Sequence, residues 1–363
     1  MANLEGAILA GTWVLGASPQ PDESVGPEPD EAALIPVLCY GLGPIGLGVA
    51  EILAERPGVA LADAVDIDPA KIGADLGDLL GGPAAGVPVT GEPGVAPPRG
   101  VAVHATGSRL AEVEPQLAGL LERGWNVVST CEELAYPVPA DHAVARRLNE
   151  VASRRGRTVL GAGINPGFLL DALVLVLSGM CRSVRAVRVQ RVVDTNARRI
   201  PLQRKAGVGL TTAEFGALAE ANGLGHVGLR QSALMVAARL GWPVDSYRER
   251  IEPVLADAAA QTGLGRMEAG LVIGQRQQAL VVSAGREVLR YSLEMSAGAA
   301  AGDQIEIDGE PPLRQHLNGV NGDIGTAAIV ANLVPVVVAA RPGLLTMADI
   351  LPLCSVTSRG GNG

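Results

Sequence analysis

Three glycines and one acid early in the chain have the spacing of a dinucleotide-binding site. Residues 40–46 read YGLGPIG, so Gly41, Gly43 and Gly46 form a G-x-G-x-x-G pattern. In such a pattern the first glycine allows a tight turn, the second lets a pyrophosphate approach the backbone, and the third lets a helix lie close to a strand. Asp66 follows about 20 residues later, where an acid accepts the ribose hydroxyls of the cofactor.

A strand, a helix and a second strand must position these residues. Residues 35–39 form an apolar run before the glycines, residues 45–56 have helical apolar spacing, and the apolar run 59–67 carries Asp66. The free N–H groups at the helix start favour phosphate, and Pro44 suits the first helical turn. The alternative is a glycine turn that only joins packed elements. We predict that the dinucleotide binds Gly41, Leu42, Gly43, Pro44, Ile45, Gly46 and Asp66.

Composition limits the other classes of function. A chain of 363 residues is long enough for two domains. The net charge of −9 and the scarcity of aromatic residues (3 Trp, 4 Tyr, 2 Phe) disfavour nucleic-acid binding. The four cysteines show no C-x-x-C spacing, which favours reduced thiols in a cytoplasmic protein. No Cys/His cluster indicates a metal site.

Two apolar segments need a separate interpretation. Residues 7–17 could pass for the core of an export signal, but no Lys or Arg precedes them, and residues 20–31 are typical of a linker. We expect residues 1–33 to form an added strand or hairpin of unclear role. Residues 324–340 are interrupted by Asn332 and Pro335, which favours a buried helix over a membrane span.

The chain continues to alternate after residue 69, which indicates a parallel sheet with right-handed crossovers. We expect helices at residues 69–80, 109–123 and 141–155, and strands at residues 101–106, 126–130 and 158–162. Ligands lie beyond the carboxyl ends of such strands. The loops that open there are Gly107-Ser108, residues 131–137 and residues 163–168.

The second half of the chain has a different character. Residues 184–193 and 267–297 have strand patterns, whereas Thr211 and Glu214 predict a capping box for a helix that ends near Gly223. We therefore predict an α/β protein with a Rossmann-type parallel-sheet domain and an α+β domain for substrate binding and dimerisation. The expected division is an extension at 1–33, a dinucleotide-binding domain at 34–168, the second domain at 169–323, and a returning segment at 324–363.

Several motifs in these loops resemble the 2,4-diaminopentanoate dehydrogenase family. They are HATGSRL, NVVSTCEELAYP, GAGINPGFLLD, RVVD followed by RR, GHVGLR, GD followed by TAAIVAN, and PGLLTMADILP. The family includes the native amine dehydrogenases and is related in fold to dihydrodipicolinate reductase. The resemblance begins near residue 35 and implies conversion of a ketone or aldehyde and ammonia to an amine with a reduced nicotinamide cofactor. The paired histidines of dihydrodipicolinate reductases are missing, because no two histidines here are adjacent.

The acids Glu132 and Glu133 are the candidate catalytic residues. Reductive amination passes through an iminium cation, which a carboxylate stabilises, and a carboxylate can also take a proton from ammonium. The family places an essential glutamate in this motif. Neighbouring residues at a strand end point to opposite sides, so we expect Glu133 to face the cleft and Glu132 to cap or pair locally. The alternative is that both are exposed acids at a helix start.

Further residues of the three loops, and three from the second domain, complete the predicted site. We expect Asn165 to hold the nicotinamide amide or the substrate, although N-P-G is also a common turn. Arg191 belongs to a basic stretch that is more typical of a solvated strand face, and His226 could simply be structural. The remaining cofactor candidates are Thr106, Gly107, Ser108, Thr130, Cys131 and Gly167, and the substrate candidates are Phe168, Arg191 and His226.

The sequence allows either NAD or NADP as the cofactor and more than one function. Asp66 and Asp68 favour NAD, because a 2′-phosphate would meet like charge, whereas Lys71 could turn toward the phosphate of NADP. We predict an NAD(P)-dependent amine dehydrogenase that works as a homodimer on a small carbonyl compound and ammonia. One alternative is a 2,4-diaminopentanoate-type amino acid dehydrogenase, in which Arg191 would meet the carboxylate. The other is a dinucleotide-binding regulator without turnover.

Overall fold

The computed structural model describes residues 34–138, 141–221 and 223–350. The strand or hairpin expected in residues 1–33 lies outside these described residues.

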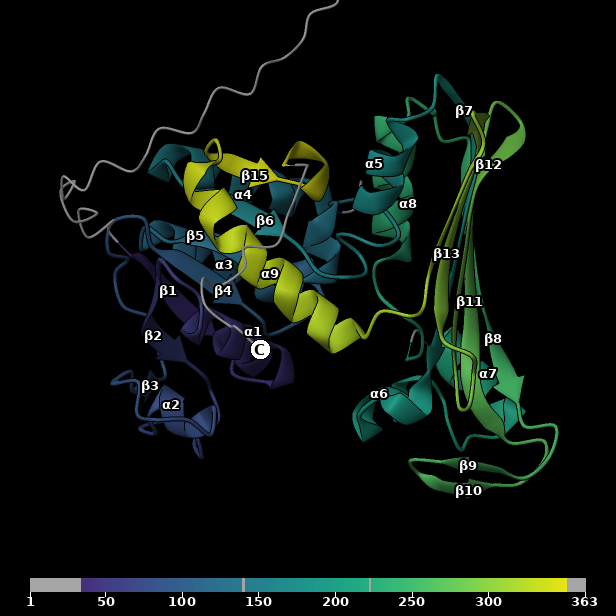
Figure 1. Cartoon of the computed structure of the whole chain (residues 1–363), viewed down its shortest axis with the longest axis horizontal. Coiled ribbons are helices and arrows are strands. Elements are labelled where there is room, and N and C mark those ends of the chain that lie inside the picture. Colours follow the sequence, from purple (N-terminus) through teal and green to yellow (C-terminus); the bar gives the residue numbers. More distant parts are fainter. Residues whose placement is uncertain (1–33, 139–140, 222, 351–363) are drawn as a thin grey trace, which may run out of the picture. The chain divides into compact units, whose positions relative to one another are not determined.

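A seven-stranded parallel sheet forms the first half of the fold (Figure 1). Its strand order is β15-β6-β5-β4-β1-β2-β3, and every pair in it is parallel. The predicted Rossmann-type architecture is thereby confirmed. The strands are β1 (Ile35–Tyr40), β2 (Val59–Val65), β3 (Val89–Thr90), β4 (Val101–His104), β5 (Asn126–Ser129), β6 (Thr158–Gly161) and β15 (Gly343–Leu345).

Helices cover both faces of this sheet, because alternate strand residues face opposite sides. Val37 and Cys39 pack with α1 (Pro44–Ala54) and α9 (Gly322–Ala339). Leu38 packs with α3 (Leu110–Glu122) and α4 (His142–Arg155) on the other face. Strands buried on both faces are what a parallel sheet requires.

Helix α9 is long and apolar enough to cross a membrane by length and composition alone. In the structure it lies against α1 and strands β4, β5 and β6, with Val330, Leu333 and Val334 fully buried. Figure 1 shows it in yellow in front of the first sheet, with one end turned toward the second sheet. It therefore serves as a core helix of this fold.

One predicted helix is wrong. Of residues 69–80, only α2 (Leu76–Leu79) is helical. The Asp75 carboxylate accepts hydrogen bonds from the backbone N–H groups of Gly77, Ala85 and Val87. These bonds hold the segment in turns, because an aspartate offers the backbone an alternative to helical pairing.

The second sheet has six strands in the order β14-β13-β7-β12-β11-β8. Strands β7 and β12 are parallel, and the other neighbours are antiparallel. A small hairpin, β9 (Ala260–Thr262) with β10 (Gly265–Met267), follows β8. The strands are β7 (Ser183–Asp194), β8 (Ser246–Leu255), β11 (Val272–Ser283), β12 (Arg286–Ser296), β13 (Gly302–Glu310) and β14 (Leu313–Leu317).

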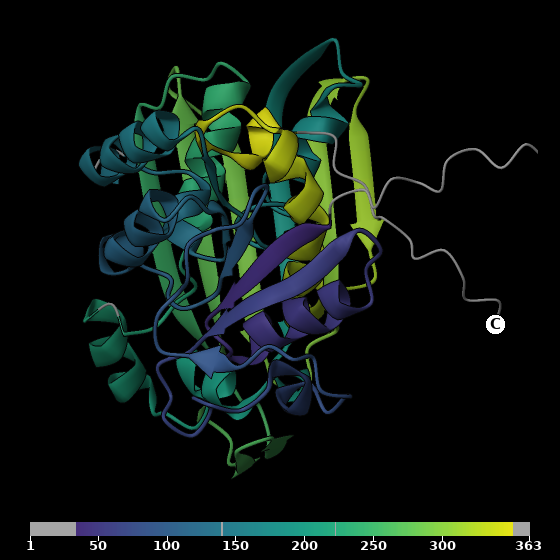
Figure 2. The same ribbon diagram turned by 90° about the vertical axis from the view of Figure 1, so that its left-hand side faces the viewer.

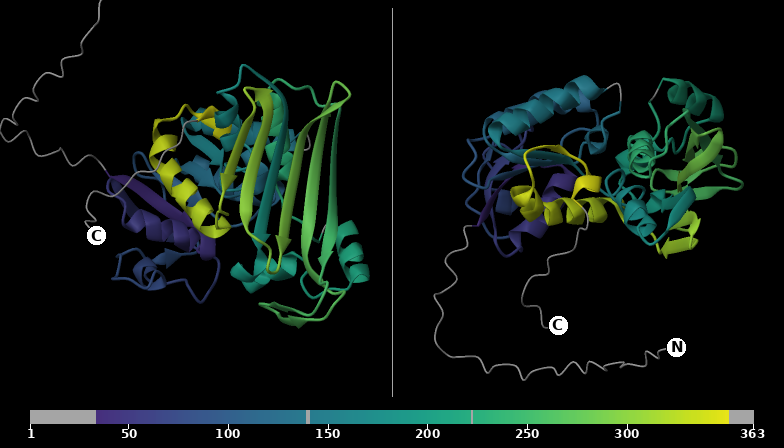
Figure 3. Two further views of the ribbon diagram at one scale, coloured as in Figure 1. Left: turned by 45° about the vertical axis from the view of Figure 1, so that its right-hand side comes forward. Right: turned by 90° about the horizontal axis from the view of Figure 1, so that it is seen from above.

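One face of this second sheet turns toward the first sheet, which Figure 2 shows in front of it. Helices α5 (Ala172–Ser178) and α8 (Leu229–Arg239) pack on that face. Helices α6 (Ile200–Lys205) and α7 (Thr212–Glu220) lie toward one end of the strands, and α7 has the predicted Thr211–Glu214 capping box. Among the described residues, no helix covers the opposite face (Figure 3).

Candidate active site

The glycine turn between β1 and α1 has the shape needed for a phosphate. Gly41 has φ +91°, and a Cβ there would lie 2.6 Å from the Ala105 carbonyl oxygen. A Cβ on Gly46 would lie 1.9 Å from the Gly41 carbonyl oxygen. Gly43, in contrast, has nothing within 4 Å of its Cβ position. The turn is thus tightly built on its inner side and open at Gly43, just before α1 begins, where a dinucleotide pyrophosphate would fit.

Asp66 follows β2 and is bound to the same turn. Its carboxylate accepts hydrogen bonds from the backbone N–H of Leu42 at 2.8 Å and of Asp68 at 2.8 Å, and from Lys71 Nζ at 3.0 Å. Burial alone raises the pKa of Asp66, but these hydrogen bonds and the Lys71 ammonium outweigh it and hold the pKa below its usual value. Lys71 Nζ also donates to the Leu42 carbonyl oxygen. Asp66 and Lys71 therefore lie together where the adenine ribose would bind.

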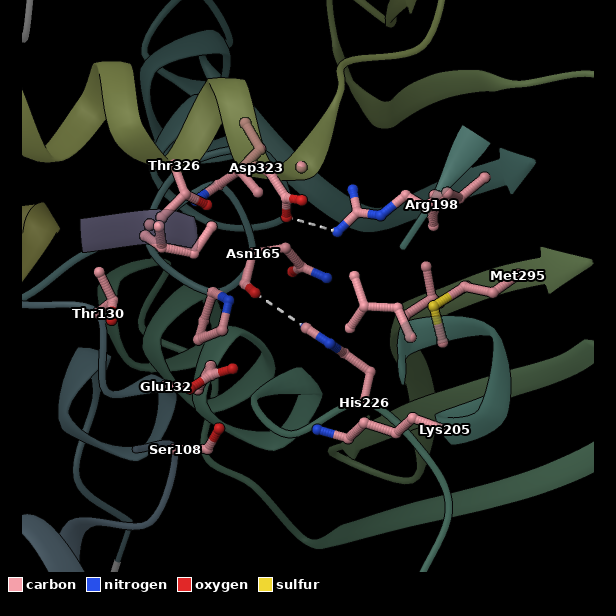
Figure 4. Close-up of a pocket in the computed structure, with 18 of the residues that line it drawn as sticks. Ser108, Thr130, Glu132, Asn165, Arg198, Lys205, His226, Met295, Asp323 and Thr326 are labelled. Carbon is pink, nitrogen blue, oxygen red and sulfur yellow. Dashed lines mark hydrogen bonds and ion pairs between the residues drawn. The ribbon is translucent and has the colours of Figure 1, made fainter. Parts of the chain in front are cut away.

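A pocket of about 330 Å³ lies between the strand ends of the first sheet and the inner face of the second (Figure 4). The first sheet contributes the loops after β4, β5 and β6. The second contributes strand residues and the segment that leads into α6. The lining includes Ile45, Thr106, Gly107, Ser108, Thr130, Glu132, Asn165, Arg191, Val193, Thr195, Arg198, Arg199, Leu202, Lys205, His226, Leu293, Met295, Asp323 and Thr326.

The two adjacent acids have different surroundings. Glu132 lines this pocket, where burial raises the pKa of its carboxyl, while the Ser108 hydroxyl and the Lys205 ammonium act in the opposite direction. Glu133 accepts hydrogen bonds from Arg109 Nη1 at 2.8 Å and from the Leu110 backbone N–H at 2.7 Å. It thus binds the first turn of α3, where negative charge is favourable. The expectation that Glu133 faces the cleft and Glu132 pairs locally is corrected.

The cause is local geometry. Glu132 begins a short 3₁₀ helix, η1 (Glu132–Ala135), instead of extending strand β5. Strand alternation therefore does not apply to these two residues. Glu133 lies instead beside a second cavity of about 840 Å³, which shares Ser108, Lys205, Gly225 and His226 with the first.

The loop after β6 places Asn165 in the pocket. Its backbone carbonyl oxygen accepts a hydrogen bond from His226 Nε2 at 2.9 Å. Gly167, at φ +122°, lies beside Gly163, and its N–H donates to the fully buried Asp171 at 2.8 Å. Asp171 also accepts from the Ser232 hydroxyl of α8 at 2.7 Å. The N-P-G turn is therefore held from both sides.

Besides Glu133, three predicted residues of the loops after β5 and β6 do not line the pocket. Cys131 is buried, and its Sγ donates to the Ser108 carbonyl oxygen. Gly167 shapes the loop but does not line the pocket, and Phe168 packs against the hydrophobic core. The structure thus brings Thr106, Gly107, Ser108 and Thr130 to the pocket and leaves these three outside it.

Arg191 is the buried exception in the basic stretch of β7 and α6, most of whose basic residues are exposed. Arg191 is 4% exposed and binds Asp303 Oδ1 at 2.8 Å and the Val320 carbonyl oxygen at 2.7 Å. Burial lowers the pKa of Arg191, and the Asp303 carboxylate opposes that shift. The interpretation as a solvated strand face is thus wrong for Arg191, because this side chain connects the second sheet to the segment before α9.

Other cations of the pocket were not predicted as site residues. Arg198 and Arg199 both pair with Asp323 at the start of α9, at 2.9 and 3.1 Å. The Lys205 ammonium forms no hydrogen bond or ion pair with any part of the chain that the structure describes. Their positions depend on how the second sheet folds back, which no local motif signals.

The glycine turn, the acid after β2 and the pocket at the ends of β4, β5 and β6 define an NAD(P)-dependent oxidoreductase of the Rossmann type. A model of the 2,4-diaminopentanoate dehydrogenase C-terminal domain matches residues 168–359. The chain belongs to this family.

Individual relatives agree with that assignment. The chain is 29% identical over 333 residues to 2,4-diaminopentanoate dehydrogenase of Acetoanaerobium sticklandii, which covers 87% of this chain and 93% of that one. It is also similar to the structure of an amine dehydrogenase from Mycobacterium smegmatis, with a TM-score of 0.76, 28% identity, and coverage of 89% of this chain and 97% of the other. A probable dehydrogenase from Thermotoga maritima, at a TM-score of 0.53, 13% identity, and coverage of 87% and 92%, shares the fold alone.

Proposed function

We propose that this chain catalyses the NAD(P)H-dependent reductive amination of a ketone or aldehyde with ammonia, and the reverse oxidative deamination. The observation that carries the proposal is the position of Glu132. Its carboxylate lines the pocket at the end of β5, and no ion pair with a described residue neutralises it. The family membership and the similarity to an amine dehydrogenase support the same reaction.

The chain's own residues would hold the cofactor in an extended site. The pyrophosphate would bind at the open side of Gly43 and the start of α1, and the adenine ribose beside Asp66 and Lys71. Thr106, Gly107 and Ser108 would lie along the nicotinamide half. When bound, the reduced nicotinamide supplies a hydride.

Glu132 would carry the proton chemistry. Its burial raises the pKa of the carboxyl toward the range in which it can both accept and return a proton. In the amination direction, the carboxylate takes a proton from ammonium, which frees the nitrogen lone pair to attack the carbonyl carbon. The carboxyl group returns this proton to the hydroxyl group of the resulting hemiaminal, which leaves as water, and the carboxylate restored in this way stabilises the iminium cation. A buried negative charge favours this cation more strongly than one in bulk water would.

The mixed sheet would bind the rest of the substrate. Val193, Leu293 and Met295 give the far wall an apolar surface. Arg198, Arg199 and Lys205 add positive charge beside it, and Lys205 has no described partner. This positive charge favours one second candidate, a 2,4-diaminopentanoate-type amino acid whose carboxylate these cations would meet. Arg191, the cation that the sequence suggested for that role, is bound to Asp303.

A substrate panel tests the proposal. Small aldehydes, cyclic ketones and 4-oxo acids would each be mixed with ammonium and NADH or NADPH, and cofactor oxidation followed by absorbance. We expect ammonia-dependent oxidation with at least one class of carbonyl compound. The 2,4-diaminopentanoate-type candidate requires that 4-oxo acids be preferred over neutral ketones of equal length. Cofactor binding without ammonia-dependent turnover of any compound would instead favour a dinucleotide-binding regulator.

We also propose that the chain is a homodimer whose copies meet through the uncovered face of the six-stranded sheet. That face carries arginines and acids on neighbouring strands, such as Arg276 with Glu294 and Arg185 with Asp308. A face with both charges can pair with a copy of itself about a two-fold axis. Light scattering on the purified chain tests this, and a monomer would contradict it. A cytoplasmic location fits the unpaired thiols of Cys39, Cys131 and Cys181.

A further inference from the structure

Asn165 has a buried polar atom for which the described residues supply no partner. The residue lines the pocket and is 9% exposed, and its side-chain Oδ1 forms no hydrogen bond. Buried carbonyl oxygens are rarely left in this state, unless a ligand or an ion satisfies them. Figure 4 shows the side-chain amide inside the pocket, with its nitrogen toward Met295 and away from Thr130.

The backbone around this amide is fixed. His226 Nε2 must be protonated in order to donate to the Asn165 carbonyl oxygen at 2.9 Å. Burial lowers the pKa of His226 to about 4, so the ring is neutral near pH 7 and adds no positive charge to the pocket. On the other side, Gly167 N–H is bound to Asp171. The acceptor on Asn165 is therefore held in one place before any ligand binds.

Asn165 and Glu132 leave the first sheet at neighbouring strand ends. Ser129 of β5 pairs with Gly161 of β6, and the Ala162 N–H donates to the Ser129 carbonyl oxygen at 2.8 Å. Glu132 lies three residues beyond Ser129 and Asn165 four residues beyond Gly161. Both line the same pocket. One carboxylate and one amide oxygen thus face a common space as acceptors.

An ammonium ion or an iminium N–H group has only donors, so it needs several acceptors around it. The other carboxylate of the pocket, Asp323, is bound to Arg198 and Arg199. Building on the function proposed above, we propose that Asn165 Oδ1 binds the nitrogen substrate, accepting one N–H of ammonium and later of the amine, while Glu132 takes the proton.

The experiment compares the wild type with Asn165→Leu, which keeps the branched shape of the side chain and removes the acceptor. The KM for ammonium is measured at saturating NADH and carbonyl compound, and the Kd for NADH is measured by fluorescence. We expect the KM for ammonium to rise about tenfold or more, because a hydrogen bond to a charged donor is lost, with the Kd for NADH changed less than about twofold. Asn165→Asp keeps an acceptor and should retain a KM near that of the wild type.

Asn196→Ala serves as the matched control, since its amide donates to the Gln261 carbonyl oxygen outside the pocket. It should leave both constants unchanged. Asn165→Ala replaces the leucine variant if the latter does not fold. A weaker Kd for NADH with an unchanged KM for ammonium would assign the amide to the nicotinamide and overturn the proposal, as would no change in either constant. A wild type without ammonia-dependent turnover would overturn the proposed function as well.

Discussion

Glu132 and Glu133 are neighbours in the chain, yet their carboxylates lie beside different cavities. Glu132 lines the pocket at the end of β5, whereas Glu133 binds Arg109 and the first turn of α3. The 3₁₀ turn that starts at Glu132 separates them. One acid is therefore available to a ligand, while the other joins the loop to the preceding helix α3.

The first prediction concerns this pair. Glu132→Gln should lower kcat/KM for reductive amination by about 10²–10⁴-fold, because it removes the proton acceptor and the charge beside the iminium. Glu133→Gln should leave kcat/KM within about tenfold and cost about 1 kcal/mol of unfolding free energy, from the lost contacts with Arg109 and the helix end. Steady-state kinetics and urea unfolding of both variants check this. Equal activity losses in the two variants would contradict the assignment.

The second prediction is a shift in pH dependence. Amination needs ionised Glu132, so the rate falls as the pH drops through the pKa of this group. The Lys205 ammonium lowers that pKa, against the larger effect of burial, which raises it. In Lys205→Met, the pH below which kcat/KM falls should therefore be higher than in the wild type. Arg204→Met, an exposed change on the same helix and outside the pocket, is the control. If kcat/KM falls at the same pH in Lys205→Met and in the wild type, the ammonium does not act on Glu132.

The third prediction concerns the choice of cofactor. Lys71 Nζ lies 3.0 Å from Asp66 Oδ2 and also binds the Leu42 carbonyl oxygen. A 2′-phosphate beside Asp66 needs a nearby cation, which Lys71 can supply by turning away from that carbonyl. Lys71→Met should raise the KM for NADPH about tenfold and change the KM for NADH much less. An equal effect on both cofactors would mean that Lys71 acts only by holding Asp66.

The fourth prediction concerns stability. Arg191 and Asp303 form an ion pair with side-chain exposures of 5% and 2%. Arg191→Ala would leave the Asp303 carboxylate buried without its partner and should cost about 3–5 kcal/mol of unfolding free energy. Arg185 lies in the same strand as Arg191 and forms an exposed pair with Asp308 of β13, so Arg185→Ala should cost about 1 kcal/mol or less. Urea titration of the two variants measures the difference, and similar values for both would show that burial of the Arg191 pair adds nothing.

The features that the sequence predicted well are those set by neighbouring residues. The glycine turn, the helix after it and the acid after β2 all depend on the chemistry of about 30 consecutive residues. The Thr211–Glu214 capping box is equally local, and it forms as expected. The parallel sheet follows from the alternation of such units.

The features that the sequence missed depend on distant partners. The position of Arg191 is decided by Asp303, 112 residues further on. Lys205 and Arg198 reach the pocket only because the mixed sheet folds back over the strand ends. The failed helix at residues 69–80 and the exchanged positions of the Glu132 and Glu133 side chains have a different cause. In both places a side-chain hydrogen bond or a 3₁₀ turn outweighs the regular periodicity on which the expectation was based.

The return of the chain through α9 to β15 has a mechanical consequence. The polypeptide passes from the first sheet to the second after β6 and passes back before α9, so two separate connections join the halves of the pocket. Two connections allow one easy rotation of the two halves, about the axis that joins these connections. Opening of the pocket for substrate exchange would therefore follow a single arc, and each closure would bring the wall carrying Lys205 back to the same place opposite Glu132.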